Sequence, residues 1–362
     1  MAQNTPIAGS PAVFNIDQSG KWPILLTCMP GLEDLVSRQI CAEYPQYTVS
    51  ETRRGKVFLR VCATIRDLCE IRCADNLYLL LREFEVGRVK EDLAGLSRAI
   101  SGTDFAPLHA LLPRGKKTFR VAVSASRSGD HTYSRYQAAE AALQALLRLD
   151  KTFAAGSPDD SDINFRLDIV GNLASFSMKL TTASFRYRGG ARMFMPGAIR
   201  PSIANVMVWL SQPNDSDIFL DPFCGSGTIV SEREHYAAGK IFASDLSDEA
   251  VAATKNNVSP RVVVTKADAC RLRFQNGAIT TIVTNLPWDV QVRAGEGAEA
   301  LYADFLRSAH RVMARASKMI VLTGRERAWE DACVRCQTSF AKLAVLSLHG
   351  LHPALYQVEI PR

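Results

Sequence analysis

The residues best suited to chemistry form a short turn, DPFCGSGT, from Asp221 to Thr228. The turn follows the apolar run 218–220 and opens into a predicted helix that begins at Ile229. Gly225 and Gly227 can take positive φ and let another molecule approach the backbone. An apolar run, a carboxylate, spaced glycines and a helix start are typical of a strand that delivers a turn against a bound cofactor. The alternative is an ordinary strand-to-helix turn without a ligand.

A second motif, NLPW, runs from Asn285 to Trp288. An amide, a residue whose carbonyl faces the site, a proline and an aromatic ring form a cradle for a planar base with an exocyclic amine. The Asn285 Oδ1 and the Leu286 carbonyl can accept the two amine hydrogens, while Trp288 can stack on the base. Asp289 follows and could help remove a proton, although an aspartate there is more often structural. Alone, NLPW fits a proline loop with an aromatic lid; beside the glycine turn, we favour base binding.

Two further carboxylates follow the strands predicted between these motifs. Asp245 ends the next strand, in FASDLSD, where a carboxylate can accept hydrogen bonds from both ribose hydroxyls of a nucleoside cofactor. Asp268 follows the third strand, in KADAC, and is placed to meet an adenine amino group. We therefore expect the glycine turn, the two carboxylates and NLPW to act together.

The elements that must position these residues alternate between strand and helix. After a helix at 201–210, the predicted strands are 218–220, 240–244, 261–265, 280–284, 318–322, 343–348 and 355–360, and the predicted helices are 229–238, 248–256, 300–314 and 327–336. Ser226 or Thr228 can cap the first helix after the turn. This alternation predicts an α/β fold, a doubly wound Rossmann-like parallel sheet with helices on both faces.

The first 200 residues predict a different organisation. After a flexible tail (1–20), residues 21–88 predict strands and helices in the order βαββαβ, a ferredoxin-like α+β domain. Residues 89–182 form a second domain, with predicted helices 92–100, 104–112 and 134–149, a strand at 118–124 and a hairpin of 163–170 with 174–180. Residues 183–200 predict a linker to the C-terminal domain, 201–362.

Composition limits the class of protein. A chain of 362 residues with 47% hydrophobic and 22% charged residues is a folded protein rather than a disordered or collagen-like one. We expect a cytoplasmic protein that does not enter a membrane, because no apolar run approaches the roughly 20 residues of a span and no signal sequence begins the chain. The nine scattered cysteines predict no disulfide framework, and the pair Cys333 and Cys336 lacks partners for a zinc site, so we expect no metal.

The positive charge is concentrated in the first part of the chain. Residues 1–200 carry 26 Lys and Arg against 20 Asp and Glu, whereas residues 201–362 carry 17 of each. An appended basic region suggests a polyanionic partner, although a solvated basic surface is the common alternative. The candidate RNA contacts are Arg114, Lys116, Lys117, Arg127, Arg135, Arg186, Arg188 and Arg192.

These residues together carry a family resemblance. The strand from Phe119, the segment with Arg127, Gly129 and His131, the helix from Ser134 and the strands ending at Thr181 resemble the THUMP domain, an RNA-binding module. DPFCGSGT resembles the first motif of class I S-adenosylmethionine-dependent methyltransferases that methylate amines. NLPW resembles their (D/N)PP(Y/F/W) motif, with Leu286 in place of the first proline. The complete chain after the tail resembles the THUMP-containing tRNA guanine-N2 methyltransferases.

The resemblance implies methyl transfer from S-adenosyl-L-methionine to the N2 amine of a guanosine in the tRNA acceptor stem, typically guanosine 6, by a monomeric enzyme. The implied catalytic residues, which hold the target base, are Asn285, Leu286, Pro287 and Trp288. The implied cofactor contacts are Asp221, Pro222, Phe223, Gly225, Gly227, Thr228, Asp245, Leu246, Asp268, Ala269 and Asn285. Three alternatives stay open: a ribosomal RNA guanine-N2 methyltransferase, a non-catalytic RNA-binding protein and, least favoured, a dinucleotide-dependent oxidoreductase.

Overall fold

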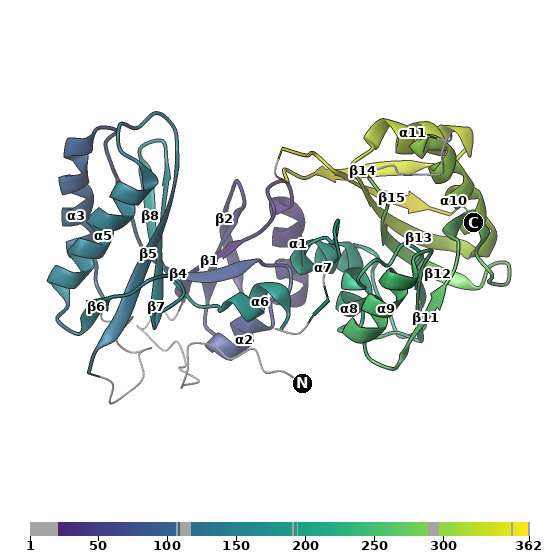
Figure 1. The fold of residues 1–362 in the computed structure, drawn as a ribbon, viewed down its shortest axis with the longest axis horizontal. Coiled ribbons are helices and arrows are strands. Elements are labelled where there is room, and N and C mark those ends of the chain that lie inside the picture. Colours follow the sequence, from purple (N-terminus) through teal and green to yellow (C-terminus); the bar gives the residue numbers. More distant parts are fainter. Residues whose placement is uncertain are drawn as a thin grey trace. The chain divides into compact units, whose positions relative to one another are not determined.

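The computed structural model describes residues 21–105, 108, 117–189, 192–193, 195–288, 297–348 and 350–360. The chain divides into two compact units (Figure 1). The N-terminal unit comprises the chain up to Thr27, residues 40–52 and residues 56–186. The C-terminal unit comprises residues 28–39, 53–55 and 187–362. In the described residues each unit contains one large β-sheet, which confirms the predicted α/β class.

The N-terminal sheet has eight strands in the order β2-β3-β1-β4-β8-β7-β5-β6 among the residues described. Their bounds are β1 (Trp22–Thr27), β2 (Thr48–Arg53), β3 (Lys56–Val61), β4 (Asn76–Glu85), β5 (Phe119–Ser128), β6 (Phe153–Ala155), β7 (Ile163–Val170) and β8 (Leu173–Lys179). The helices along this stretch are α1 (Glu33–Glu43), α2 (Ile65–Cys69), η1 (Lys90–Asp92), α3 (Leu93–Ser101), α5 (Arg135–Leu149) and α6 (Ala183–Tyr187). β4 pairs with β8 in antiparallel fashion, so one continuous sheet runs through both predicted N-terminal domains.

Local sequence explains several of these elements. The Ser134 side chain accepts a hydrogen bond from the Gln137 backbone, and the Gln137 side chain bonds back to the Ser134 backbone, so a capping box begins α5. The hairpin predicted for 163–170 with 174–180 forms as β7 and β8, and it turns at Gly171, where φ is 59°. α2 spans only five residues and β6 only three.

The C-terminal sheet has seven strands in the order β11-β10-β9-β12-β13-β15-β14 within the described part of the chain. Their bounds are β9 (Ile218–Asp221), β10 (Lys240–Asp245), β11 (Val262–Lys266), β12 (Ile279–Asn285), β13 (Met313–Thr323), β14 (Phe340–Val345) and β15 (Ala354–Glu359). Strands β9 to β13 pair in parallel, whereas β15 is antiparallel to both β13 and β14. The predicted parallel sheet is therefore confirmed for β9 to β13, and the sheet is mixed because of β15. Residues 346–353, which join β14 to β15, are too few for the crossover that a parallel pair needs.

Helices cover both faces of this sheet. They are α7 (Pro201–Leu210), α8 (Thr228–Arg233), α9 (Asp248–Asn257), η2 (Ala269–Arg271), α10 (Ala298–Val312) and α11 (Glu326–Arg335). In Figure 1, α7, α8 and α9 group on one side of the strands, and α10 with α11 on the other. α7 has the predicted bounds, with Pro201 in its first turn. Gly227 is the N-cap residue of α8 and makes no side-chain cap, so the expected cap from Ser226 or Thr228 does not form.

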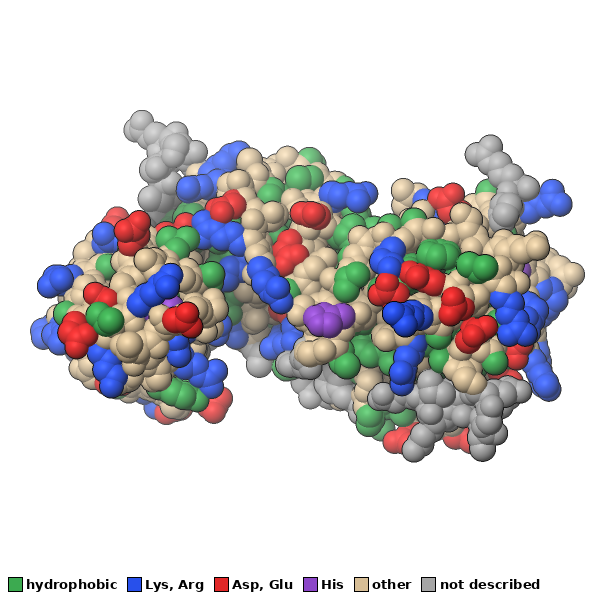
Figure 2. Space-filling view, turned by 90° about the horizontal axis from the view of Figure 1, so that it is seen from above, with side chains coloured by type: hydrophobic (Ala, Val, Ile, Leu, Met, Phe, Trp, Pro, Cys, Tyr) green, Lys and Arg blue, Asp and Glu red, His purple; other side chains and the backbone are tan. Residues whose placement is uncertain are grey.

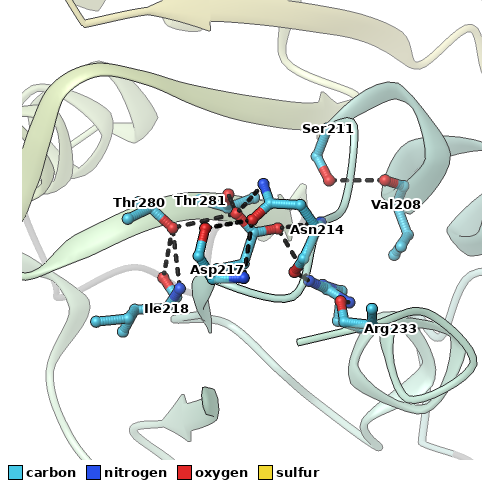
Figure 3. Close-up of polar contacts among 10 residues, drawn as sticks. Val208, Ser211, Asn214, Asp217, Ile218, Arg233, Thr280 and Thr281 are labelled. Atoms are coloured by element: carbon cyan, nitrogen blue, oxygen red, sulfur yellow. Dashed lines mark hydrogen bonds and ion pairs between the residues drawn. The ribbon is translucent and has the colours of Figure 1, made fainter. Parts of the chain in front are cut away.

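A buried ion pair supports the amino end of β9, away from the glycine turn (Figure 3). The Arg233 Nη2 of α8 donates to the Asp217 Oδ2 at 2.9 Å, and both side chains are almost fully buried. The other Asp217 oxygen accepts hydrogen bonds from Asn214 Nδ2 and from the hydroxyls of Thr280 and Thr281. This cluster joins α8, β9 and β12 at the start of the strand that leads to Asp221.

We expect Arg233→Met to lower the free energy of unfolding by about 3–5 kcal/mol, because Asp217 would remain buried without its cation. Urea denaturation followed by circular dichroism measures the change. Arg307→Met is the matched control: Arg307 pairs with Asp304 on the surface, where such pairs contribute about 0–1 kcal/mol. Equal losses in the two variants would contradict a special contribution from the buried pair.

Candidate functional site

The carboxyl ends of the parallel strands β9, β10, β11 and β12 border one cavity of about 640 Å³. The residues of both motifs and both intervening carboxylates line it: Asp221, Pro222, Phe223, Gly225, Thr228, Asp245, Leu246, Asp268, Ala269, Asn285, Leu286, Pro287 and Trp288. In open α/β sheets, ligands bind at this edge, where the connections diverge to opposite faces. The structure thus brings together segments that are up to 67 residues apart in the sequence.

The two glycines of the turn have different surroundings. Both take left-handed φ values, 52° at Gly225 and 78° at Gly227. A Cβ added at Gly225 would meet no atom within 4 Å, so the backbone there is open to an incoming ligand. A Cβ at Gly227 would lie 3.0 Å from Thr254 Cγ2 of α9. Gly227 therefore provides close packing and is not among the residues that line the cavity, in contrast to its predicted role as a cofactor contact.

Helix α9 supports the glycine turn through two polar side chains that the motifs did not indicate. The Thr254 hydroxyl donates to the Gly225 carbonyl at 2.8 Å, and the Asn257 Nδ2 donates to the Ser226 carbonyl at 2.8 Å. The Cys224 thiol is buried against Thr254, and burial raises its pKa far above the usual range. Cys224 is therefore a neutral packing residue and not a nucleophile.

Asp221 ends β9 at the wall of the cavity. Its Oδ1 accepts hydrogen bonds from the Thr284 hydroxyl at 2.8 Å and from the Phe223 N–H at 3.3 Å. Burial raises the pKa of Asp221 to about 7, against the opposing effect of these two hydrogen bonds, and the charge of Asp245 raises it further. This carboxyl group consequently titrates near neutral pH.

The titration of Asp221 predicts a pH dependence of stability. Since the folded-state pKa is above the unfolded value, the folded state holds the proton more tightly, and stability falls as pH rises from about 4 to about 7. We expect Asp221→Asn to be more stable than the wild type at pH 8, and this advantage to disappear near pH 4. Thermal unfolding across that range measures it. Asp248→Asn, at an exposed surface carboxylate, is the control and should show no such trend.

Asp245 and Asp268 are held by backbone hydrogen bonds. The Asp245 Oδ2 accepts from the Gly225 N–H at 3.0 Å, and its Oδ1 accepts from the Ser247 N–H at 3.0 Å. Each carboxylate oxygen has a second lone pair, so the group can still accept two hydroxyl hydrogens. The Asp268 Oδ1 accepts from the Cys270 N–H at 2.9 Å and begins the short helix η2. Leu246, 61% exposed, adds an apolar wall beside these carboxylates.

The segment Asn285–Trp288, here called the acceptor loop, begins at the last residue of β12. The Asn285 Oδ1 is buried, and no atom of the described residues donates a hydrogen bond to it. A buried acceptor without a donor costs about 1–3 kcal/mol, a cost that a ligand N–H group can remove. Leu286 is fully buried, and its N–H donates to the Leu322 carbonyl at 2.9 Å. Asp289 lies outside the described residues.

Part of the predicted linker belongs to the cavity. Residues 195–199 line it, and the Met193 backbone exchanges two hydrogen bonds with the Asn257 side chain, at 2.9 and 2.7 Å. The short helix α6 also lies in this stretch. These contacts could not be predicted from residue type, because Met195, Pro196 and Gly197 carry no reactive groups.

The predicted RNA contacts have different environments. Arg114 and Lys116 lie outside the described residues, and Lys117 is exposed. Arg127 is exposed and its Nη1 donates to the Gly129 carbonyl at 3.0 Å, while Arg135 lies over the Tyr136 ring at 4.8 Å. In the view of Figure 2, Lys and Arg side chains are interspersed with Asp and Glu and form no single large patch.

The arginines of the predicted linker contact the protein itself. The Arg188 Nε donates to the Glu232 Oε1 of α8 at 3.1 Å, and both side chains are buried. Arg188 therefore neutralises a buried carboxylate, and we withdraw it as a candidate RNA contact. Arg192 donates to the Ser231 hydroxyl. Arg186 is half-buried. Burial lowers the pKa of Lys179, and the charges of Arg186 and Arg166 lower it further.

Within the ranges described above, no group of three or more His, Cys, Asp or Glu side chains is placed to hold a metal ion. Among the same residues, no helix is long and apolar enough to cross a membrane.

Comparison with known proteins agrees with this geometry. Residues 188–353 match the family model UPF0020, described as an RMKL-like methyltransferase domain. The chain is 27% identical over 310 residues to the tRNA (guanine(6)-N2)-methyltransferase of Thermus thermophilus, covering 83% of this chain and 88% of that protein. It is 22% identical over 363 residues to the tRNA (guanine(6)-N2)-methyltransferase of Methanocaldococcus jannaschii, covering 86% and 92%. The crystal structure of TrmN from Thermus thermophilus has the same fold, with a TM-score of 0.74 at 24% identity over 93% of this chain and 99% of that one.

The fold and the site thus define an S-adenosylmethionine-dependent methyltransferase. The residues present fit that cofactor, because the cavity combines an open backbone at Gly225 with an Asp245 carboxylate whose oxygens each keep a second lone pair. Over more than four-fifths of its length the chain is similar to tRNA (guanine(6)-N2)-methyltransferases, and the resemblance predicted from the sequence is confirmed.

Proposed function

We propose that this protein transfers a methyl group from S-adenosylmethionine to the N2 amine of guanosine 6 in the tRNA acceptor stem, giving N2-methylguanosine. The near full-length relatives support the substrate and the position. The buried Asn285 Oδ1, which lacks a donor among the described residues and lies at the cofactor cavity, is the observation that carries the chemistry. An amine N–H group is the partner that this atom lacks.

The acceptor loop orients the amine. The Asn285 Oδ1 and the Leu286 carbonyl accept the two amine hydrogens, and the Trp288 ring stacks on the base. Holding both hydrogens reduces delocalisation of the nitrogen lone pair into the ring and directs it along the line of attack. The cofactor, when bound, supplies an electrophilic methyl group on a sulfonium centre. No covalent bond to the enzyme is needed, consistent with the neutral, buried thiol of Cys224.

Other residues of the cavity hold the cofactor. Asp245 would accept hydrogen bonds from the ribose hydroxyls, and Asp268 would accept one from the adenine amino group beside Ala269. Asp221 lines the same cavity, and a positively charged cofactor bound there would favour ionisation of this carboxyl group, which titrates near neutral pH. The remaining cavity residues predicted from the sequence, Pro222, Phe223, Thr228 and Leu246, shape the walls.

The N-terminal unit binds the RNA. Its first six elements follow the order βαββαβ, and their strands lie in the order β2-β3-β1-β4, which supports a ferredoxin-like domain at 21–88. Residues 89–182 are the THUMP domain. Lys117, Arg127, Arg135 and Arg186 contribute phosphate contacts, which provide affinity that decreases with salt but read no sequence.

The test is transfer of labelled methyl groups to unmodified tRNA, with the product nucleoside identified by mass spectrometry. We expect N2-methylguanosine at position 6, and no transfer to a tRNA with inosine at that position, because inosine lacks the amine. Preferential transfer to ribosomal RNA fragments would favour the alternative substrate. Absence of S-adenosylmethionine binding in calorimetry would favour a non-catalytic RNA-binding protein.

A further inference from the structure

We infer that four residues outside both motifs, Tyr302, Thr323, Gly324 and Arg325, act as positioning residues that fix the acceptor loop and the Trp288 ring. We call them the acceptor-loop clamp. Tyr302 belongs to α10, Thr323 ends β13, and Gly324 and Arg325 form the connection to α11. The inference rests on the proposed function, because it assigns these residues to the placement of the methyl-accepting base.

Three consecutive residues of the acceptor loop are each tied to a residue outside it. The Leu286 N–H donates to the Leu322 carbonyl at 2.9 Å. The Tyr302 hydroxyl donates to the Pro287 carbonyl at 2.9 Å, and the Arg325 Nε donates to the Trp288 carbonyl at 2.8 Å. The backbone of the loop is therefore held at every residue after Asn285.

A buried hydroxyl pair connects two of these ties. The Tyr302 and Thr323 hydroxyls are 3.1 Å apart, and both residues are fully buried. Because the Tyr302 proton goes to the Pro287 carbonyl, Thr323 donates to the Tyr302 oxygen, and its own oxygen accepts from the Arg325 N–H at 3.0 Å. Burial raises the pKa of Tyr302, so this phenol stays protonated and remains a donor. Thr323 thus links the tie at Pro287 to the residue that makes the tie at Trp288.

Gly324 determines where the Trp288 ring can lie. A Cβ added at Gly324 would be 3.0 Å from Trp288 Cγ and Cδ2 and 3.2 Å from Cε3, closer than such atoms normally approach. The φ of Gly324 is not in the left-handed region, so the backbone conformation does not demand glycine. Space for the indole is the reason for glycine here.

The clamp compensates for a departure in the motif. Leu286 stands where the resembling family has a proline, so the acceptor loop lacks one rigid ring, and the ties from α10 and β13 restrict it instead. Groups that react must be held to within a fraction of an ångström, and a shift of about 1 Å can reduce the rate by about 10²-fold. Displacing Trp288 should consequently affect the transfer step more than cofactor binding.

The test is Gly324→Ala in the full-length protein, with kcat for tRNA methylation, the Kd for S-adenosylmethionine and tryptophan fluorescence as readouts. We expect kcat to fall about 10- to 100-fold, the Kd to stay within about two-fold, and the emission to change. In a Trp288→Ala background, the same Gly324→Ala change should alter neither kcat nor emission further, since the clash is gone. Gly95→Ala is the control, because its nearest contact is the Arg98 Nη2 at 3.9 Å and its φ is ordinary.

Tyr302→Phe provides a second test that does not add bulk, because it removes only the hydroxyl that bonds Pro287. It should lower kcat several-fold without changing the Kd of the cofactor. Unchanged kcat in both variants, or an equal effect of Gly324→Ala with and without Trp288, would overturn the inference. Failure of the proposed function is distinct: the wild type itself would transfer no methyl group to tRNA, while the fluorescence experiment would still report the contact.

Discussion

Asn285→Ala is expected to lower kcat for methyl transfer by about 10²- to 10³-fold, the typical loss when a preorganised hydrogen-bonding group at a reacting centre is removed. The variant loses the buried Oδ1 that has no donor among the described residues and that we assign to the guanine amine. The Kd for S-adenosylmethionine should stay within about two-fold of the wild type. Single-turnover transfer to tRNA and calorimetry with the cofactor measure the two quantities.

Asn285→Asp is the matched control for this change, because it keeps a side-chain oxygen at the same distance from the backbone. It should retain much more activity than Asn285→Ala. A large loss of cofactor affinity in Asn285→Ala would show that this residue mainly binds the cofactor, and the assignment of the amine acceptor would be wrong.

Asp245→Ala is expected to raise the Kd for S-adenosylmethionine by about 10²-fold or more, because two hydrogen bonds to a charged acceptor contribute about 1.5–3 kcal/mol each. The loss also releases the Gly225 N–H, which Asp245 holds at 3.0 Å, so the glycine turn loses a tie. At saturating cofactor, kcat should recover to within a few-fold of the wild type. Calorimetry and methyl transfer at varied cofactor concentration provide both numbers.

Asp248→Ala is the control that distinguishes loss of the Asp245 carboxylate from a general loss of negative charge. Asp248 is three residues from Asp245, but its side chain is 81% exposed and pairs with Lys266 on the surface. It should leave the Kd of the cofactor unchanged. If Asp245→Ala and Asn285→Ala weakened cofactor binding equally, the proposed division between cofactor binding and base binding would be contradicted.

The period of apolar residues was sufficient to predict the order of most elements in both units. The glycine turn, Asp245, Asp268 and the acceptor loop converge because each follows a parallel strand, and parallel strands end at the same edge of a sheet. That geometric rule needs only the strand positions. The antiparallel direction of β15 was not predicted, although no helix was predicted between the last two strands, because the order of elements along the chain does not determine which strands become neighbours in the sheet.

The supporting contacts could not be predicted from the sequence, since they depend on partners far along the chain. Arg188 lies in a glycine-rich segment, where a solvated arginine is expected. Its actual partner is Glu232, which is 44 residues away in the sequence. Thr254 holds the glycine turn, and Tyr302 holds the acceptor loop. The apolar pattern of a helix indicates which face is buried, but it does not indicate which distant backbone group a buried hydroxyl will contact.

The pairing of β4 with β8 has a consequence for synthesis of the chain. The register joins Tyr78 to Lys179, so the edge of β4 stays uncovered on the ribosome until about a hundred further residues have been made. An exposed strand edge during this interval can pair with another chain, and contacts of long sequence separation form slowly. A gene fragment that stops after β4 should yield a protein that aggregates. A fragment designed to express the N-terminal unit should therefore end beyond Lys179.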